Sequence, residues 1–433
     1  MLNWPLDEVY LTSLLSCQPP SSQKQGVNPY PAKNRSKKPS KVGHSPQALL
    51  ISDLFFSSFH MIPFNDSIVS AFQAIHKTSP ELSHLFWQAA QADVVTPASD
   101  LLFAVRSRFP LSFLPLLHIL SSSLHSGTRE IIFNYFVSLP TYTQTLQRGF
   151  TGYDIIEEER DNTLISLKSD LRVFSEREDG EGAVIVQTGT VGRLLSRGES
   201  VPTVMWEWPF NGWALLGRVL ETVLANGVTQ VITADETYMS ILTAIFNFLS
   251  RAMTDAGVEG VANVVQATSE EMAQEWDVIS VTWEMVSQVL EALDIGNITH
   301  VDLINLLHLA ESGLTLLTAA IQGREASIWS LIVKGGTKWW GRLSRVGITA
   351  EMACQDECIP LTIAGIAFVE ALFAAAIRNI VLSDGFSTHL RKEVLLVAGE
   401  YVTDIWLNFN EWKYIVANRR FEIGIQDPRS SQS

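Results

Sequence analysis

The residues with the clearest potential for chemistry are two cysteines four positions apart. Cys354 and Cys358 would lie one turn apart on a helix, and two thiolates at that spacing can supply half of a zinc site. No histidine or further cysteine lies close to them in the sequence, although a structural zinc ion takes four ligands. The sequence therefore favours two ordinary buried thiols, and we expect no metal and no cofactor.

Other candidates for catalysis or phosphate binding are weak. Gly335–Lys338 lacks the spacing of a phosphate loop and favours a loop between helices, while Gly189–Gly192 favours the entry to a strand. His300 and His308 have no Ser, Cys or Asp partner at a catalytic spacing. A triad assembled from distant positions remains open, but the sequence contains no established catalytic motif, and we do not expect an enzyme.

Three of the twelve tryptophans, Trp206, Trp208 and Trp213, flank a predicted transition from strand to helix. Aromatic side chains line the peptide grooves of SH3 domains, so these three residues are candidates for peptide binding. The alternative is that they pack the strands against the helices, because buried aromatic rings contribute large contact areas. The sequence favours packing.

Helices are expected on both sides of these tryptophans. Ser79 and Thr96 each precede a proline, which predicts helices at Pro80–Ala92 and Pro97–Arg108. An irregular connector is expected at Leu139–Thr163. Three capping boxes then predict helix starts in the second half of the chain, each followed by an apolar stripe: Thr233 with Glu236, Thr268 with Glu271, and Thr299 with Asp302.

Residues 164–212 have a different pattern. Strands are expected at Ala183–Val186, Thr190–Leu195 and Val201–Trp208, where glycines separate short runs and residues alternate in character. Several short strands within about fifty residues predict a small SH3-like β-barrel. Two long helices, Pro360–Leu382 and Phe386–Val416, are expected to follow the central helices.

The predicted fold is mostly α. It is an irregular HEAT-like α-solenoid interrupted by the barrel, because no exact repeat period is present. The expected organisation is a disordered tail at 1–46, a helical segment with its connector at 47–163, the β insertion at 164–212, a helical solenoid at 213–425 and a disordered end at 426–433.

The charge distribution restricts the partners. The net charge is −15, and Lys24–Lys41 holds six basic residues and no acidic one. An acidic body repels phosphate backbones, so direct nucleic-acid binding is not expected. The run Lys33–Lys41 is a candidate nuclear-import signal or a solvated basic linker.

The most hydrophobic stretch, Ile359–Leu382, is long enough to span a membrane. It contains Glu370 and Arg378, which favour a buried helix over a transmembrane one. No secretory signal is recognised in the first residues, and three cysteines favour a reducing compartment.

Several long segments resemble one known family. They are SDLLFAVRSRFPLSFLPLL (99–117), LPTYTQ (139–144), GFTGYD (149–154), TGTVGRLLSRG (188–198), MWEW (205–208) and WALLGRVLE (213–221). Together they are similar to the N-terminal half of the large inner-ring scaffold nucleoporins of the nucleoporin 188 class. Members of that class are much longer, and the basic tail does not look familial, so we expect a truncated or mispredicted gene product.

The resemblance implies an α-solenoid with an inserted SH3-like barrel and a structural role in the inner ring of the nuclear pore complex. The implied location is the nuclear envelope, and the implied process is nucleocytoplasmic transport of protein and mRNA. The implied partners are an adaptor nucleoporin of the ninety-three type, linker nucleoporins and Phe-Gly repeats. It supplies no catalytic residues. The alternative is a soluble karyopherin-like transport receptor or adaptor built on a similar helical array.

Overall fold

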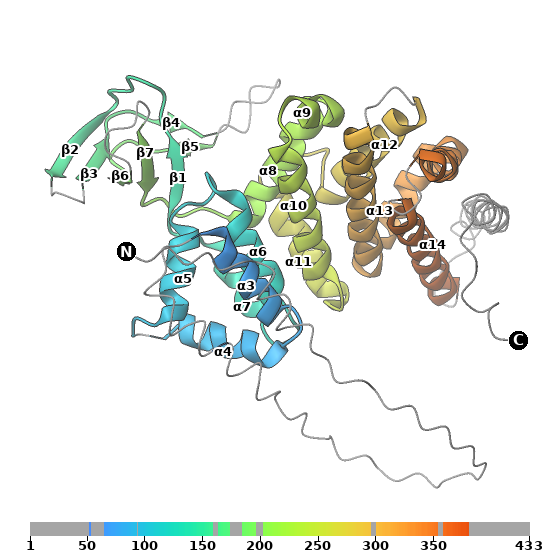
Figure 1. Cartoon of the computed structure of the whole chain (residues 1–433), viewed down its shortest axis with the longest axis horizontal. Coiled ribbons are helices and arrows are strands. Elements are labelled where there is room, and N and C mark those ends of the chain that lie inside the picture. Colours follow the sequence, from blue (N-terminus) through green and yellow to red (C-terminus); the bar gives the residue numbers. More distant parts are fainter. Residues whose placement is uncertain are drawn as a thin grey trace, which may run out of the picture.

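A computed structural model of the chain describes Ser52 and residues 65–380, apart from 93, 159–162, 174–183, 196–201, 296–299 and 354–357. The predicted disordered ends, the predicted helix Phe386–Val416, the import-signal candidate and Cys354 lie outside the described residues. The described part is mostly helical and contains a small antiparallel sheet (Figure 1).

Five short helices form the first helical block. Proline starts α4 and α5 as predicted, and Thr96 forms a reciprocal capping box with Ser99. Both helices end two residues before the expected position. The bounds are α3 Asp66–His76, α4 Pro80–Ala90, α5 Pro97–Arg106, α6 Phe113–Ser123 and α7 Arg129–Val137.

Seven strands follow the first block. The five-stranded sheet has the order β1-β7-β6-β3-β2, and β4 pairs with β5 in a second small sheet. All of these pairs are antiparallel. The bounds are β1 Tyr142–Thr145, β2 Tyr153–Glu158, β3 Thr163–Leu167, β4 Leu171–Arg172, β5 Ile185–Val186, β6 Val191–Leu194 and β7 Thr203–Trp206.

The sheet begins earlier than the sequence predicted. β1 and β2 lie in the stretch 139–163 that was expected to be irregular, and that expectation is wrong for both strands. The sequence of β1 is polar, and a bulge in β2 between Ile155 and Glu157 breaks the two-residue period. In the described residues β1 and β2 are the two edges and do not pair, so the sheet is open and no closed barrel is seen.

In the part of the chain that the structure describes, seven helices form the second block, and they follow one another along the long axis of the molecule (Figure 1). The predicted helix Pro360–Leu382 corresponds to α14. Gly335–Lys338 lies inside α13, so the expected loop there is wrong: two glycines cost a helix only about 1 kcal/mol each. The bounds are α8 Gly212–Ala225, α9 Val228–Ala234, α10 Thr237–Met253, α11 Gly257–Ser269, α12 Val278–Ile295, α13 His300–Ala353 and α14 Cys358–Ile380.

Two of the predicted capping boxes are wrong, and Thr299 of the third lies outside the described residues. Thr233 and Thr268 lie inside α9 and α11, and the Thr268 hydroxyl donates to the Val264 carbonyl at 2.7 Å. The start of α12 is set by Asp277 and Ser280, whose side chains each accept from the other's backbone N–H at 2.8 and 2.9 Å. A Thr hydroxyl inside a helix can instead donate to the carbonyl four residues earlier, as Thr233 and Thr268 do, so a Thr followed by a Glu does not by itself mark a helix start.

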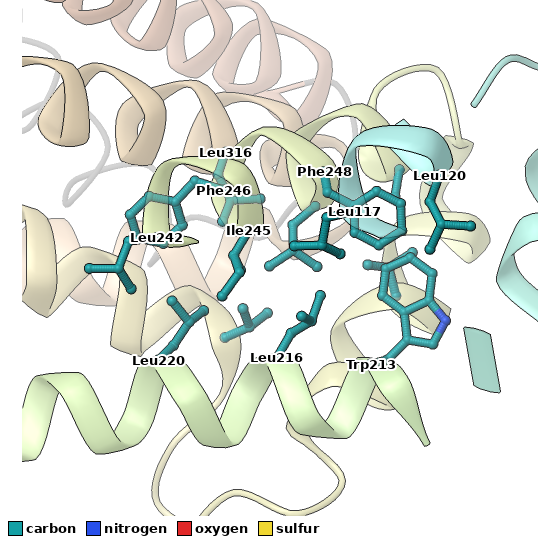
Figure 2. Close-up of a cluster of buried hydrophobic side chains, with 14 of the residues drawn as sticks. Leu117, Leu120, Trp213, Leu216, Leu220, Leu242, Ile245, Phe246, Phe248 and Leu316 are labelled. Carbon is teal, nitrogen blue, oxygen red and sulfur yellow. The ribbon is translucent and has the colours of Figure 1, made fainter. Parts of the chain in front are cut away.

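The core is continuous across both helical blocks. Figure 2 shows its centre, where side chains of α6, α8, α10 and α13 point toward one another. The labelled residues are Leu117, Leu120, Trp213, Leu216, Leu220, Leu242, Ile245, Phe246, Phe248 and Leu316.

One described segment, Leu303–Ile332 of α13, is long and apolar enough to cross a membrane. Within its most apolar 18-residue stretch, 61% is buried inside the molecule. Buried core helices pass the same test, so one such segment is only weak evidence for a membrane span. Pro360–Leu372, within the stretch that the sequence suggested, forms a shorter apolar helix.

Close packing between α8 and α11 depends on a glycine. A Cβ atom added to Gly217 would lie 2.0 Å from the Thr268 carbonyl oxygen and 3.1 Å from the Met272 sulfur. The contact on the carbonyl is with backbone, which cannot move without shifting α11. The two helices can therefore approach this closely only with glycine at position 217.

We expect Gly217→Ala to destabilise the protein by about 1–3 kcal/mol, because overpacking forces the two helices apart. Urea unfolding followed by circular dichroism measures the change. Gly127→Ala is the matched control, since no atom lies within 4 Å of the added methyl group. Equal stability of the two variants would contradict this account of the α8–α11 contact.

Candidate functional site

Trp206 and Trp213, two of the predicted candidates, are buried. Trp206 is fully buried on β7, and its ring lies over Gly192 of β6, where an added Cβ would come within 2.5 Å of it. Trp213 is 1% exposed in the first turn of α8. Its ring stacks on Phe248 with centroids 4.9 Å apart, and its Nε1 donates to the Phe133 carbonyl at 3.2 Å. Neither ring is accessible to a ligand on the surface.

Trp208, the third candidate, keeps part of its ring exposed. It stacks on Phe210 with centroids 5.9 Å apart and meets the edge of Tyr142 at 5.7 Å. Burial raises the pKa of the Tyr142 hydroxyl. The structure thus brings Trp208 close to the first strand but leaves it on the rim of the sheet.

Trp208 and Trp213 belong to one chain of touching rings, which we call the aromatic bridge. It runs from the sheet into the helical core, and neighbouring ring centroids are 4.9–6.2 Å apart. These separations are typical of favourable aromatic pairs. Its members in order are Trp208, Phe210, Phe109, Phe136, Trp213 and Phe248.

Backbone and capping contacts hold the same junction. Leu139 and Phe210 exchange both backbone hydrogen bonds, at 3.0 and 2.9 Å. The Asn211 side chain accepts from the backbone of Trp213 at 2.9 Å and caps α8, while its Nδ2 donates to Glu270 at 2.5 Å. These contacts tie the sheet to the helices, and of the three candidate tryptophans they leave only Trp208 partly exposed.

The described residues contain no group of three metal-ligating side chains. Cys358 begins α14, and its predicted partner Cys354 lies outside the described residues. His308 is exposed, and its Nδ1 lies 3.4 Å from a carboxylate oxygen of Glu311 in the next turn. His300 begins α13. Of these residues, His308 is the one whose side chain the structure describes, and it contacts Glu311.

A shallow depression of about 480 Å³ lies between the α11–α12 loop and α13. The loop wall carries the acids Glu275 and Asp277 beside the partly buried Trp276, and the α13 wall is formed by small residues and Leu331. The helix predicted to start at the Thr268 capping box would have included Trp276, but Trp276 lies in the loop before α12. The depression is lined by Gln274, Glu275, Trp276, Asp277, Ser280, Ala326, Ser327, Ser330 and Leu331.

A buried ion pair fixes the loop wall of the depression. Arg218 and Glu221 of α8 lie 2.6 Å apart, with side chains 5% and 13% exposed. The second carboxylate oxygen of Glu221 accepts from the Ala273 backbone N–H at 3.0 Å. Partners of this kind offset the desolvation cost of a buried pair. The loop is therefore held on α8 just before Gln274.

Comparison with known proteins assigns the chain to a family. The family model described as Nucleoporin Nup188, N-terminal subdomain III matches residues 203–427, just over half of the chain. The chain belongs to the Nup188 family of nucleoporins. Nucleoporin nup184 of Schizosaccharomyces pombe (strain 972 / ATCC 24843) is 25% identical over 384 residues, which cover 87% of this chain and 23% of that protein.

The chain is thus a component of the nuclear pore complex at the nuclear envelope. It spans about a quarter of the length of the curated relative that it matches. The depression lies inside the segment matched by the Nup188 family model, whereas β1, β2 and β3 precede that segment. The family resemblance predicted from the sequence is confirmed.

Two arginines join the helical blocks of this Nup188-family chain, and the sequence analysis missed both. Arg251, near the end of α10, donates to the Leu124 carbonyl at the end of α6 at 3.2 Å. Arg129, at the start of α7, donates to the carbonyls of Asp255 and Thr254 at the end of α10. Burial lowers the pKa of Arg251. The one signal in the sequence was the position of Arg251 near the end of a helix, where basic side chains often donate to the last carbonyl groups.

We expect Arg251→Gln to destabilise the protein by about 1.5–3 kcal/mol, because it removes a charged donor from a buried helix terminus. Lys77→Gln removes the same charge from an exposed position and serves as the control. Urea unfolding midpoints measure both effects. An unchanged midpoint in Arg251→Gln would show that the bridge between α10 and α6 contributes nothing.

His76 makes the first helical block sensitive to acid. Its ring is fully buried and stacks on Phe72 with centroids 4.0 Å apart. Burial, with a smaller contribution from His125, lowers the pKa of His76 from 6.5 to about 3. The unfolded chain therefore binds a proton between these two pH values while the folded protein does not, and stability falls as the pH drops below about 6.5.

Between pH 7 and pH 5 we expect His76 to account for about 2 kcal/mol of lost stability. His76→Phe removes this loss while keeping an aromatic ring beside Phe72. Urea unfolding of both proteins at the two pH values measures the difference. The exposed His84, changed to Phe, is the control. If wild type and His76→Phe lose the same stability, the folded protein protonates His76 without cost.

Proposed function

We propose that this chain is part of a structural scaffold of the nuclear pore inner ring, which binds linker nucleoporins and so supports transport between nucleus and cytoplasm. The observation that carries the proposal is the Nup188 family match across the helices from α8 onward. The role is structural rather than enzymatic. A scaffold needs extended surface more than a catalytic pocket, and stacked helices supply it.

We further infer that the helices form part of an irregular HEAT-like α-solenoid and that the sheet is the counterpart of an SH3-like barrel. Two features support the solenoid: the helices follow one another along the long axis, and α13 packs on both α12 and α14 (Figure 1). Five antiparallel strands inserted between α7 and α8 support the second assignment. The boundaries of the insertion are then Leu139 and Phe210, which pair with each other.

The depression beside Trp276 is the surface that we assign to a linker segment. Its acidic wall suits a basic residue, and Trp276 with Leu331 suits an apolar side chain next to it. The loop that carries Trp276 is fixed by Glu221, so little ordering entropy would be lost on binding. Trp208 is the alternative anchor for a peptide, since it is the one candidate tryptophan that remains partly exposed.

Other partners follow from the same assignment. We include an adaptor nucleoporin of the ninety-three type and Phe-Gly repeats among them, and we expect no direct contact with nucleic acid because of the net charge of −15. A soluble transport receptor of the karyopherin type would instead bind a Ran-type GTPase and cargo.

Trp276→Ala should weaken retention of linker nucleoporins on the tagged, purified chain about 30-fold, as expected for a tryptophan at an interface centre. Glu275→Lys should weaken it as well through charge repulsion. Quantitative mass spectrometry of bound nucleoporins measures retention, and a fluorescent fusion reports location at the nuclear rim. Circular dichroism checks that each variant folds.

Two matched controls locate the surface. Glu259→Lys places the same charge change on an exposed position of α11 and should leave retention unchanged. Trp208→Ala removes the other candidate anchor. If Trp208→Ala alone loses the linkers, the binding surface is the rim of the sheet. Recovery of a Ran-type GTPase and cargo in place of nucleoporins would overturn the scaffold proposal.

A further inference from the structure

The five-stranded sheet ends in an open edge at β2. In the described residues β2 pairs only with β3, and it lies at the outer end of the sheet, away from the helices (Figure 1). Five of its six residues are exposed, among them Ile155 at 56% and Ile156 at 57%. An edge of this kind is a template for a further strand, because within the described residues only one side of β2 is used in strand pairing.

The bulge in β2 places two acids on one face. Asp154 lies opposite Ser166 of β3, and Glu157 lies opposite Leu164, with Ile156 as the extra residue. In a regular strand, residues three apart point to opposite faces, but the bulge brings Asp154 and Glu157 to the same face. This face already attracts a cation, since Lys168 lies 2.7 Å from Asp154.

The chain itself contains a segment with the complementary pattern. Within the basic stretch Lys24–Lys41, residues 32–38 contain no proline. Lys33, Arg35 and Lys37 occupy alternate positions, so in an extended strand all three cations share one face. Pro31 and Pro39 bound this stretch. Proline cannot donate a ladder hydrogen bond, so the two prolines would limit the added strand to these seven residues.

We propose that residues 32–38 of this chain bind the open edge of β2 as an additional strand, with Lys33, Arg35 and Lys37 on the face of Asp154 and Glu157. Backbone hydrogen bonds to β2 give the affinity, and the alternating cations fix which face of the added strand meets the acids. The proposal does not depend on the surface assigned to a linker segment, which is the depression between the α11–α12 loop and α13.

The connection is long enough for the segment to bind within its own molecule. Residues 39–64 separate it from α3, and a chain of that length extends to about 85 Å. The first described helix, α3, and the sheet lie at the same end of the molecule (Figure 1). Any partner that adds a strand to β2 would first have to displace this segment.

Hydrogen exchange of the full chain, followed by mass spectrometry, tests the proposal on peptides that contain β2. The triple variant Lys33→Glu, Arg35→Glu, Lys37→Glu should speed exchange of the β2 amides that do not bond β3 about tenfold. The control is a second triple variant, Lys24→Glu, Lys38→Glu, Lys41→Glu, which makes the same charge change at positions off the alternating face. It should leave the exchange rates of the β2 amides within about twofold of wild type. Exchange in β6 and β7 reports whether the sheet itself stays folded.

A charge swap completes the test. Adding Glu157→Lys to the first triple variant should restore protection of β2, because the opposite charges again face each other. Equal exchange in wild type and the first triple variant would overturn the proposal. So would protection that rises with protein concentration together with a dimer in sedimentation, since a second copy would then supply the strand. Neither outcome bears on the scaffold role, which is measured by nucleoporin retention.

Discussion

The structure depends on the burial of large apolar side chains where α6, α8 and α10 meet. Trp213 lies at this point, stacked on Phe248 and edge-on to Phe136, and it is almost wholly removed from water. Burying a side chain of this size contributes on the order of 2–3 kcal/mol. Because these helices come from both blocks, this cluster makes a single core of segments far apart in sequence (Figure 2).

The polar contacts between the blocks are effective because that core brings their ends together. Arg251 and Arg129 reach carbonyl groups at helix termini more than a hundred residues away, and each satisfies acceptors that a helix end leaves without partners. Such contacts add specificity as well as stability, since each arginine fits one arrangement of the helix ends. The hydrophobic contact therefore sets the distance between the blocks, and the arginines set their orientation.

The sequence predicted the helices best where apolar periodicity and proline agreed. The apolar stripe predicted after Thr299 and Asp302 is buried at Leu306, Leu307, Leu314 and Leu317, and Pro80 and Pro97 begin their helices. β1 and β2 were missed because a polar strand and a bulged strand lack the two-residue period. The Arg251 contact joins residues with no local signal between them, so only the fold could show it. Among the candidate tryptophans, the sequence identified the junction but could not tell which ring is exposed.

The pairing of Leu139 with Phe210 explains how a sheet can interrupt a helical array without disturbing it. The two residues mark the ends of the inserted segment, and their exchange of backbone hydrogen bonds brings α7 and α8 side by side. About seventy residues are thus added while α8 packs as if it followed α7 directly. β2 lies at the far edge of the insertion and is mostly exposed, so it is free of the packing constraints that fix the helices. Natural edge strands usually carry charges and bulges to prevent association, and β2 has both. The two exposed isoleucines in the same strand do not protect the edge against association. They are better explained if another strand covers the edge in the functional protein.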